Sequence, residues 1–92
     1  MIFYDKKAGV EYRIVVTNTQ AVAAIQAMID AQGKPGHPQA IARALMACLN
    51  AGEKEGFAFV WGANEELARA RGASEDELRA ARKRLEQQFF SK

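Results

Sequence analysis

The chain has 92 residues, a formal net charge of +2 and a single cysteine. Chains of this length fold as one domain and bury only about 60–65% of the surface that the unfolded chain exposes, which leaves little apolar surface for a deep pocket. The small net charge excludes a mimic of the DNA polyanion and strong phosphate binding by bulk electrostatics. A lone cysteine excludes an internal disulfide and a cysteine metal cluster. We therefore expect residues 1–92 to form a single α+β domain.

The sequence also indicates where in the cell the protein is found. The uncharged run from Thr17 to Ile29 contains polar residues and is too short for a membrane span. The segment Met1-Ile2-Phe3-Tyr4-Asp5 does not have the pattern of a secretory signal. We expect a cytoplasmic protein without a membrane partner.

Residues 1–17 predict a β-hairpin. Alternation places Val10, Tyr12, Ile14 and Val16 on one face, which is typical of a half-buried strand. A shorter strand over 2–4 precedes it, and Gly9 allows the positive φ of a tight turn between the two.

From Asn18 onwards, the spacing of the apolar residues changes to that of a helix. Val22, Ile25 and Ile29 share one arc, and Gly33-Lys34-Pro35 ends the helix. Its opposite face carries no charge and consists of Ala23, Gln26, Ala27 and Ala31. A solvated helix normally places lysine and glutamate on that face, so this one is unusual.

A second helix begins at Pro38 and ends at Gly52. Its main apolar stripe consists of Ile41, Ala44, Leu45, Cys48 and Leu49, and most of the remaining surface is also apolar, with Ala42, Met46, Ala47 and Ala51. Because it is apolar nearly all round, we expect it to be the central helix of the fold.

Phe57, Phe59 and Trp61 alternate and predict a third strand over 57–61. A short helix from Asn64 to Gly72 and a longer helix from Ser74 follow, the latter opened by a Ser-x-x-Glu capping box at 74–77. The predicted order is therefore β-β-α-α-β-α-α. We expect a small antiparallel sheet, made of the hairpin and the 57–61 strand, packed on a helical layer.

No group of residues predicts catalysis, a metal site or a cofactor site. His37 and Cys48 are separated by about 16 Å along one helix, and Cys48 lies among apolar positions, where an inert thiol is expected. The carboxylates at 65–66 and 75–77 occupy first helical turns, where they complement the helix dipole. We expect a protein that is not an enzyme and has no small-molecule substrate.

Gly56 to Val60 resembles the RNP1 strand of RNA-recognition domains, in which aromatic side chains stack on bases. Glu55 stands where that pattern has a cation, and Gly62 where it has an aromatic residue. The resemblance implies RNA stacking on Phe57, Phe59 and Trp61.

The helix pair over 64–90, joined by Arg71-Gly72-Ala73, is similar to a helix-turn-helix, with Ala68, Gly72 and Leu78 at spacings that this family favours. The resemblance implies a DNA-binding regulator, and its candidate contacts are Arg79, Arg82, Lys83 and Arg84. The amino-terminal turn of the second helix, however, presents Glu75, Asp76 and Glu77 to the phosphates.

The surface pattern favours a different function. The alanine face of the first helix permits close approach of another backbone, and aromatic residues beside arginine are frequent interface anchors. The candidate partner-binding residues are Ala23, Ala27, Ala31, Arg79, Lys83 and Phe90. We expect a small regulatory or inhibitory protein, of bacterial, phage or mobile-element type, that occupies the surface of a protein partner or of a second copy. Nucleic acid is the less favoured partner.

Overall fold

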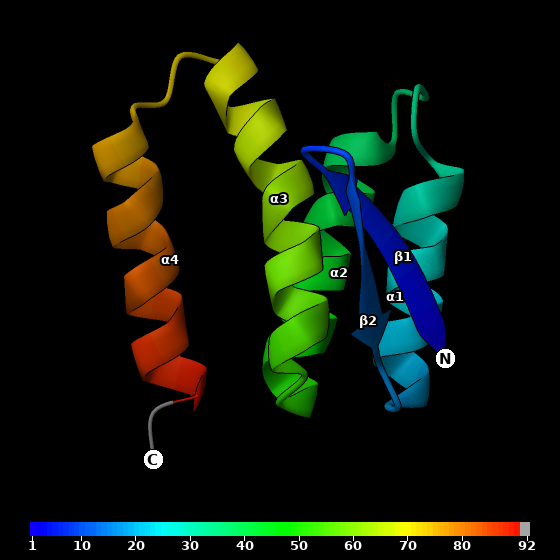
Figure 1. Ribbon diagram of the computed structural model, residues 1–92. Helices are drawn as coiled ribbons and strands as arrows, with labels where there is room; N and C mark the ends of the chain where they lie inside the picture. Colours follow the sequence, from blue (N-terminus) through cyan, green and yellow to red (C-terminus); the bar gives the residue numbers. More distant parts are fainter. Residues whose placement is uncertain (91–92) are drawn as a thin grey trace.

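In the part of the chain that the structure describes, a two-stranded antiparallel hairpin is followed by four helices (Figure 1). The computed structural model describes residues 1–90. The elements in these residues are β1 (Ile2–Lys7), β2 (Val10–Val15), α1 (Thr19–Asp30), α2 (His37–Ala51), α3 (Lys54–Ala70) and α4 (Glu75–Phe90). The α+β class is confirmed. None of these helices is both long and apolar enough to cross a membrane.

The hairpin turns through two residues of positive φ. Ala8 has φ 51° and Gly9 has φ 79°, as a type I′ turn requires. The register runs from Lys7 opposite Val10 to Ile2 opposite Val15. The predicted hairpin is therefore confirmed, with a longer first strand than expected.

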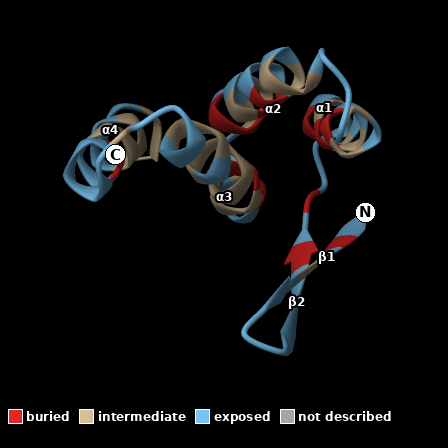
Figure 2. Ribbon diagram, turned by 90° about the horizontal axis from the view of Figure 1, so that it is seen from above, coloured by how far each residue is buried: buried red, intermediate tan, exposed pale blue. Residues whose placement is uncertain are grey.

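Only the base of the hairpin is buried. Ile14 and Val16 lie in the core, as predicted, together with Phe3 of β1. Val10 and Tyr12, which we expected on the same buried face, are 52% and 51% exposed. The reason is geometric, since the outer half of the hairpin extends away from the helices (Figure 2).

Helices α1 and α2 have clear end signals. The Asn18 side chain caps α1 by accepting a hydrogen bond from the Ala21 N–H at 3.0 Å. Gly52, with φ 69°, ends α2 in the left-handed conformation that we expected. The next residue, Glu53, accepts hydrogen bonds from the Thr17 N–H, the Thr17 hydroxyl and the Asn18 N–H at 3.1–3.3 Å. This carboxylate therefore joins the start of α1 to the turn between α2 and α3.

The predicted strand over 57–61 is wrong, because these residues lie inside α3. The predicted helix from Asn64 is the second half of that same helix. Phe57, Val60 and Trp61 are all buried, and their spacing of three and four residues is that of one helix face. The element order is thus β-β-α-α-α-α in the described part of the chain, and the sheet has no third strand there.

Gly56 explains how α3 approaches the core so closely. A Cβ atom at this position would lie 3.1 Å from Cys48 Sγ of α2 and 3.2 Å from Val16 Cγ2. The glycine is buried inside the first turns of α3. It is therefore a packing residue and does not belong to a turn before a strand.

Helices α1, α2 and α3 and the base of the hairpin enclose the core. The hairpin covers the α1 and α3 side, and α2 lies on the other side (Figure 2). Helix α2 contacts α1, α3 and α4, which agrees with its predicted central position, although its residue Met46 is 47% exposed. Helix α4 lies beyond α3, at the edge of the molecule, and buries Leu78.

Candidate protein-interaction surface

The histidine and the cysteine do not form a reactive pair. Both lie on α2, where His37 is the first residue and Cys48 belongs to the last turns. Burial, with the nearby negative charge of Glu53, raises the pKa of the Cys48 thiol to about 11, so the thiol stays protonated at neutral pH. Residues 1–90 hold no cluster of three histidine, cysteine or acidic side chains that fits a metal ion.

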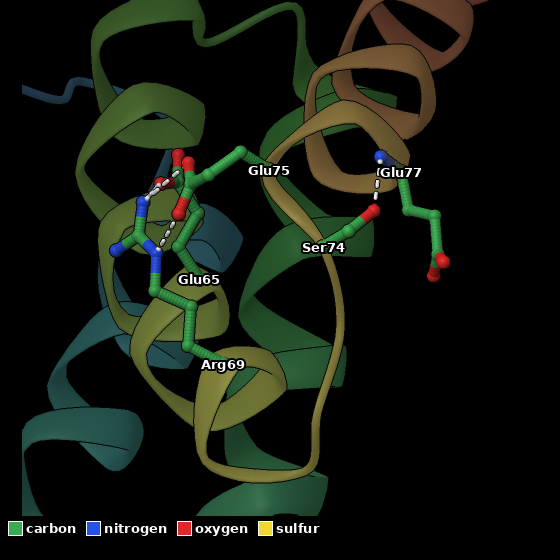
Figure 3. A network of polar contacts seen from close by, with 5 residues as sticks. All are labelled: Glu65, Arg69, Ser74, Glu75 and Glu77. Carbon is green, nitrogen blue, oxygen red and sulfur yellow. Dashed lines mark hydrogen bonds and ion pairs between the residues drawn. The ribbon is translucent and has the colours of Figure 1, made fainter.

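The acidic clusters on α3 and α4 have structural partners. Arg69 binds Glu65 at 2.6 Å and Glu75 at 2.5 Å, and so links the end of α3 to the start of α4 (Figure 3). The Ser74 hydroxyl accepts a hydrogen bond from the Glu77 N–H at 3.2 Å, which is one of the two hydrogen bonds of the predicted capping box. The hydrogen bond from Arg69 lowers the pKa of Glu75, and the pKa of Arg69 is raised by the same bond. The carboxylates of Glu65 and Glu75 therefore stabilise the junction between α3 and α4.

The predicted DNA-binding helices have a different geometry from a helix-turn-helix. Helices α3 and α4 run side by side in opposite directions (Figure 1), whereas the helices of that motif cross at about 90–120°. Arg79 pairs with Asp76 and Arg82 with Glu86, both at 3.3 Å. Lys83 and Arg84 are exposed. A DNA-binding role therefore depends on these exposed cations of α4.

The predicted partner-binding residues do not form one surface. Ala23 and Ala27 are exposed on α1, and Ala31 is half-buried at its end. Arg79 and Lys83 are exposed on α4. Helices α1 and α4 lie on opposite sides of the molecule, with α2 and α3 between them (Figures 1 and 2).

We expected Phe90 to project beside Arg79 and Lys83, but it does not. It is half-buried against the core, and its ring meets that of Phe57 edge-on at a centroid distance of 5.6 Å. The side chain therefore anchors the end of α4 to α3.

The aromatic residues of the RNP1-like segment do not offer a stacking platform. Phe57 and Trp61 are 1% and 3% exposed. Phe59 is half-buried and stacks on Phe3 of the hairpin at 6.1 Å. The prediction of RNA stacking on these three side chains is wrong, because the segment is helical and faces the core.

The surface that sequence reasoning missed is the hairpin itself. Among the described residues, the exposed large apolar side chains other than Met1 and Met46 all lie on its two strands. We call this set the hairpin patch: Ile2, Tyr4, Val10, Tyr12 and Val15, each 41–59% exposed. The signal was in the sequence, since Ile2 and Tyr4 alternate with Phe3 and must point away from whatever buries Phe3.

The patch covers both faces of the hairpin. Ile2, Tyr4 and Val15 lie on the face that points away from the helices, because they alternate with Phe3 and Ile14. Val10 and Tyr12 lie on the other face, towards the tip. Between the hairpin and α3 lies a cleft of about 270 Å³, lined by Asp5, Lys7, Tyr12, Arg13, Ile14, Glu55, Ala58 and Phe59.

Comparison of the chain with protein-family models, with curated proteins and with solved structures finds no match.

Proposed function

We propose that this chain is a non-enzymatic protein-binding protein that regulates or inhibits a partner by occupying its surface, and that the hairpin patch makes the contact. The observation that carries the proposal is the concentration of exposed large apolar side chains on one two-stranded element. Ile2, Tyr4 and Val15 are neighbours on one face of this element, and contiguous exposed apolar side chains mark interaction sites in small proteins.

The chemistry of the patch supports this function. Tyr4 and Tyr12 are more than half exposed, and tyrosine is enriched among the residues that dominate binding energy. A two-stranded sheet also has an open edge on each strand, and an extended segment of another protein adds to such an edge by backbone hydrogen bonds. Apolar side chains and a free strand edge together are suited to a protein partner.

Affinity capture from a lysate of the source cell tests the proposal. The wild-type chain is compared with Tyr4→Lys, which places a charge in the hairpin patch, and with Ala27→Lys, which makes the same charge change on the alanine face of α1. We expect a nuclease-resistant partner that Tyr4→Lys loses and Ala27→Lys retains. Loss on Ala27→Lys alone would assign binding to α1 and contradict the proposal.

The nuclease arm separates this function from DNA binding. A partner that disappears on nuclease treatment, and that a Lys83→Ala and Arg84→Ala double variant also loses, would favour the nucleic-acid alternative. A DNA-binding chain would further gain affinity for generic duplex DNA as the salt concentration falls.

A further inference from the structure

The register of the hairpin determines which backbone groups of β2 are free. Met1 and Val16 exchange two backbone hydrogen bonds, at 2.8 and 3.0 Å. Hydrogen-bonded and non-hydrogen-bonded pairs alternate along an antiparallel ladder. The pairs that exchange hydrogen bonds within the hairpin are therefore Phe3 with Ile14, Asp5 with Tyr12, and Lys7 with Val10. It follows that Glu11, Arg13 and Val15 direct their N–H and C=O groups away from β1.

This free edge is complementary to itself. Two β2 strands that pair antiparallel about Tyr12 place Glu11 of each copy opposite Arg13 of the other. Glu11 and Arg13 are exposed, and neither forms an ion pair with another described residue. The backbone N–H and C=O groups of both residues point away from β1. In this register, each opposed pair can therefore exchange two backbone hydrogen bonds. Pairing about Arg13 instead would oppose two arginines.

The same register brings apolar side chains together on the other face. It places Val10 of one copy directly opposite Ile14 of the other, where cross-strand side chains are about 5 Å apart. Ile14 lines the cleft of about 270 Å³ beside Ala58 and Phe59. The 52% exposed Val10 side chain of a second copy is therefore directed to the apolar part of this cleft.

We propose that two copies of the chain associate through their β2 edges, antiparallel about Tyr12, to form a continuous four-stranded sheet. The inference rests on the proposed function in one respect, that the hairpin is the interaction surface. Stable interfaces cover about 800 Å² on each partner, and a single pair of short strands covers less. The dimer is accordingly weak and forms in a concentration-dependent way.

Sedimentation velocity at increasing protein concentration, up to about 1 mM, measures this association. Arg13→Glu and Glu11→Arg each place two like-charged pairs across the interface. Each single variant should dimerise about tenfold or more weakly than the wild type. Lys83→Glu, a charge reversal at an exposed site on α4, is the control and should dimerise as the wild type does.

An equimolar mixture of the two single variants is the decisive arm. Every opposed pair in the mixed dimer joins an arginine to a glutamate again, so association should return. Glu11 also faces Lys6 within its own hairpin, and a variant that merely weakened the hairpin would not recover on mixing. Circular dichroism checks that each single variant keeps its helices.

A monomeric wild-type chain at about 1 mM would overturn the inference, as would single variants that dimerise normally or a mixture that stays monomeric. Capture of another protein that is lost on Tyr4→Lys, found together with a monomeric wild-type chain, would overturn the self-pairing and leave the proposed function standing. Loss of capture on Ala27→Lys alone would instead overturn the proposed function.

Discussion

At the scale of single residues, Gly56 and Gly62 on α3 have different surroundings. A Cβ atom at Gly56 meets Cys48 Sγ at 3.1 Å, whereas a Cβ atom at Gly62 meets only the end of the Lys7 side chain, at 4.0 Å. Alanine at either position gains about 1 kcal/mol of helix propensity, but overpacking costs about 1–3 kcal/mol. We expect Gly62→Ala to stabilise the fold and Gly56→Ala to destabilise it by up to about 2 kcal/mol.

Chemical denaturation of the two variants checks this prediction. The wild type is the reference, and the two substitutions are matched because both add one methyl group to the same helix. Equal stability of the two variants would show that α3 does not approach α2 as closely as described.

The Cys48 thiol offers a second test at this scale. The thiolate is the reactive form, and burial raises the pKa of this thiol to about 11. We expect alkylation at neutral pH to be slow in the folded protein and to become fast in denaturant. Mass spectrometry of the alkylated chain measures the rate. Rapid modification of the native chain would contradict the buried position of Cys48.

At the scale of elements, the hairpin and the carboxyl-terminal helix ends that a glycine follows could be predicted because their signals are local. The left-handed glycines at 33, 52 and 72 follow helices, and Gly9 forms half of the turn between β1 and β2. Such signals depend on backbone conformation, which the residue itself limits. These signals therefore do not depend on which residues pack against the segment.

Helix α3 could not be predicted because its signal is ambiguous. Phe57, Phe59 and Trp61 have the period of a strand, while Phe57, Val60 and Trp61 have that of a helix, and a short apolar run does not distinguish the two. Gly56 and Gly62 flank this run, and glycines in such positions are typical of turns at the two ends of a strand. In the folded chain the helix packs Gly56 against Cys48 of another helix, and such a contact cannot be inferred from the local sequence.

The junction of α3 and α4 carries a pH-dependent prediction. The hydrogen bond from Arg69 lowers the pKa of Glu75, so the folded state favours its carboxylate form. The resulting stabilisation is present above the ordinary glutamate pKa of about 4.3 and is lost as the pH falls through the lowered pKa. Because both side chains are exposed, the effect on stability is small.

We therefore expect Glu75→Gln to increase hydrogen exchange at the start of α4 at pH 7 relative to the wild type. The difference between the two should vanish at a pH below the lowered pKa. Glu66→Gln, on the exposed face of α3, is the control and should show no such difference. A Glu75→Gln effect that persists at low pH would mean that the Arg69 pair does not hold the junction.

At the scale of the whole molecule, the candidate site depends on which surfaces the fold leaves open. The alanine face of α1 was visible in the sequence and is exposed at Ala23 and Ala27. The other predicted contacts, Arg79 and Lys83 of α4, lie away from this face, because α2 and α3 separate the two helices. The hairpin patch was missed because a third strand was expected in the sheet. Because 57–61 is helical, the sheet has two strands within residues 1–90, and Tyr4 and Tyr12 remain more than half exposed there.

Site-specific photo-cross-linking tests the central claim, that the hairpin contacts the partner, most directly. A photoreactive phenylalanine analogue is placed singly at position 4 on the hairpin, 27 on α1 or 83 on α4, all exposed positions, and irradiated in the source cells. We expect a protein adduct from position 4 and none from positions 27 and 83. Adducts from position 27 or 83, with none from position 4, would contradict it.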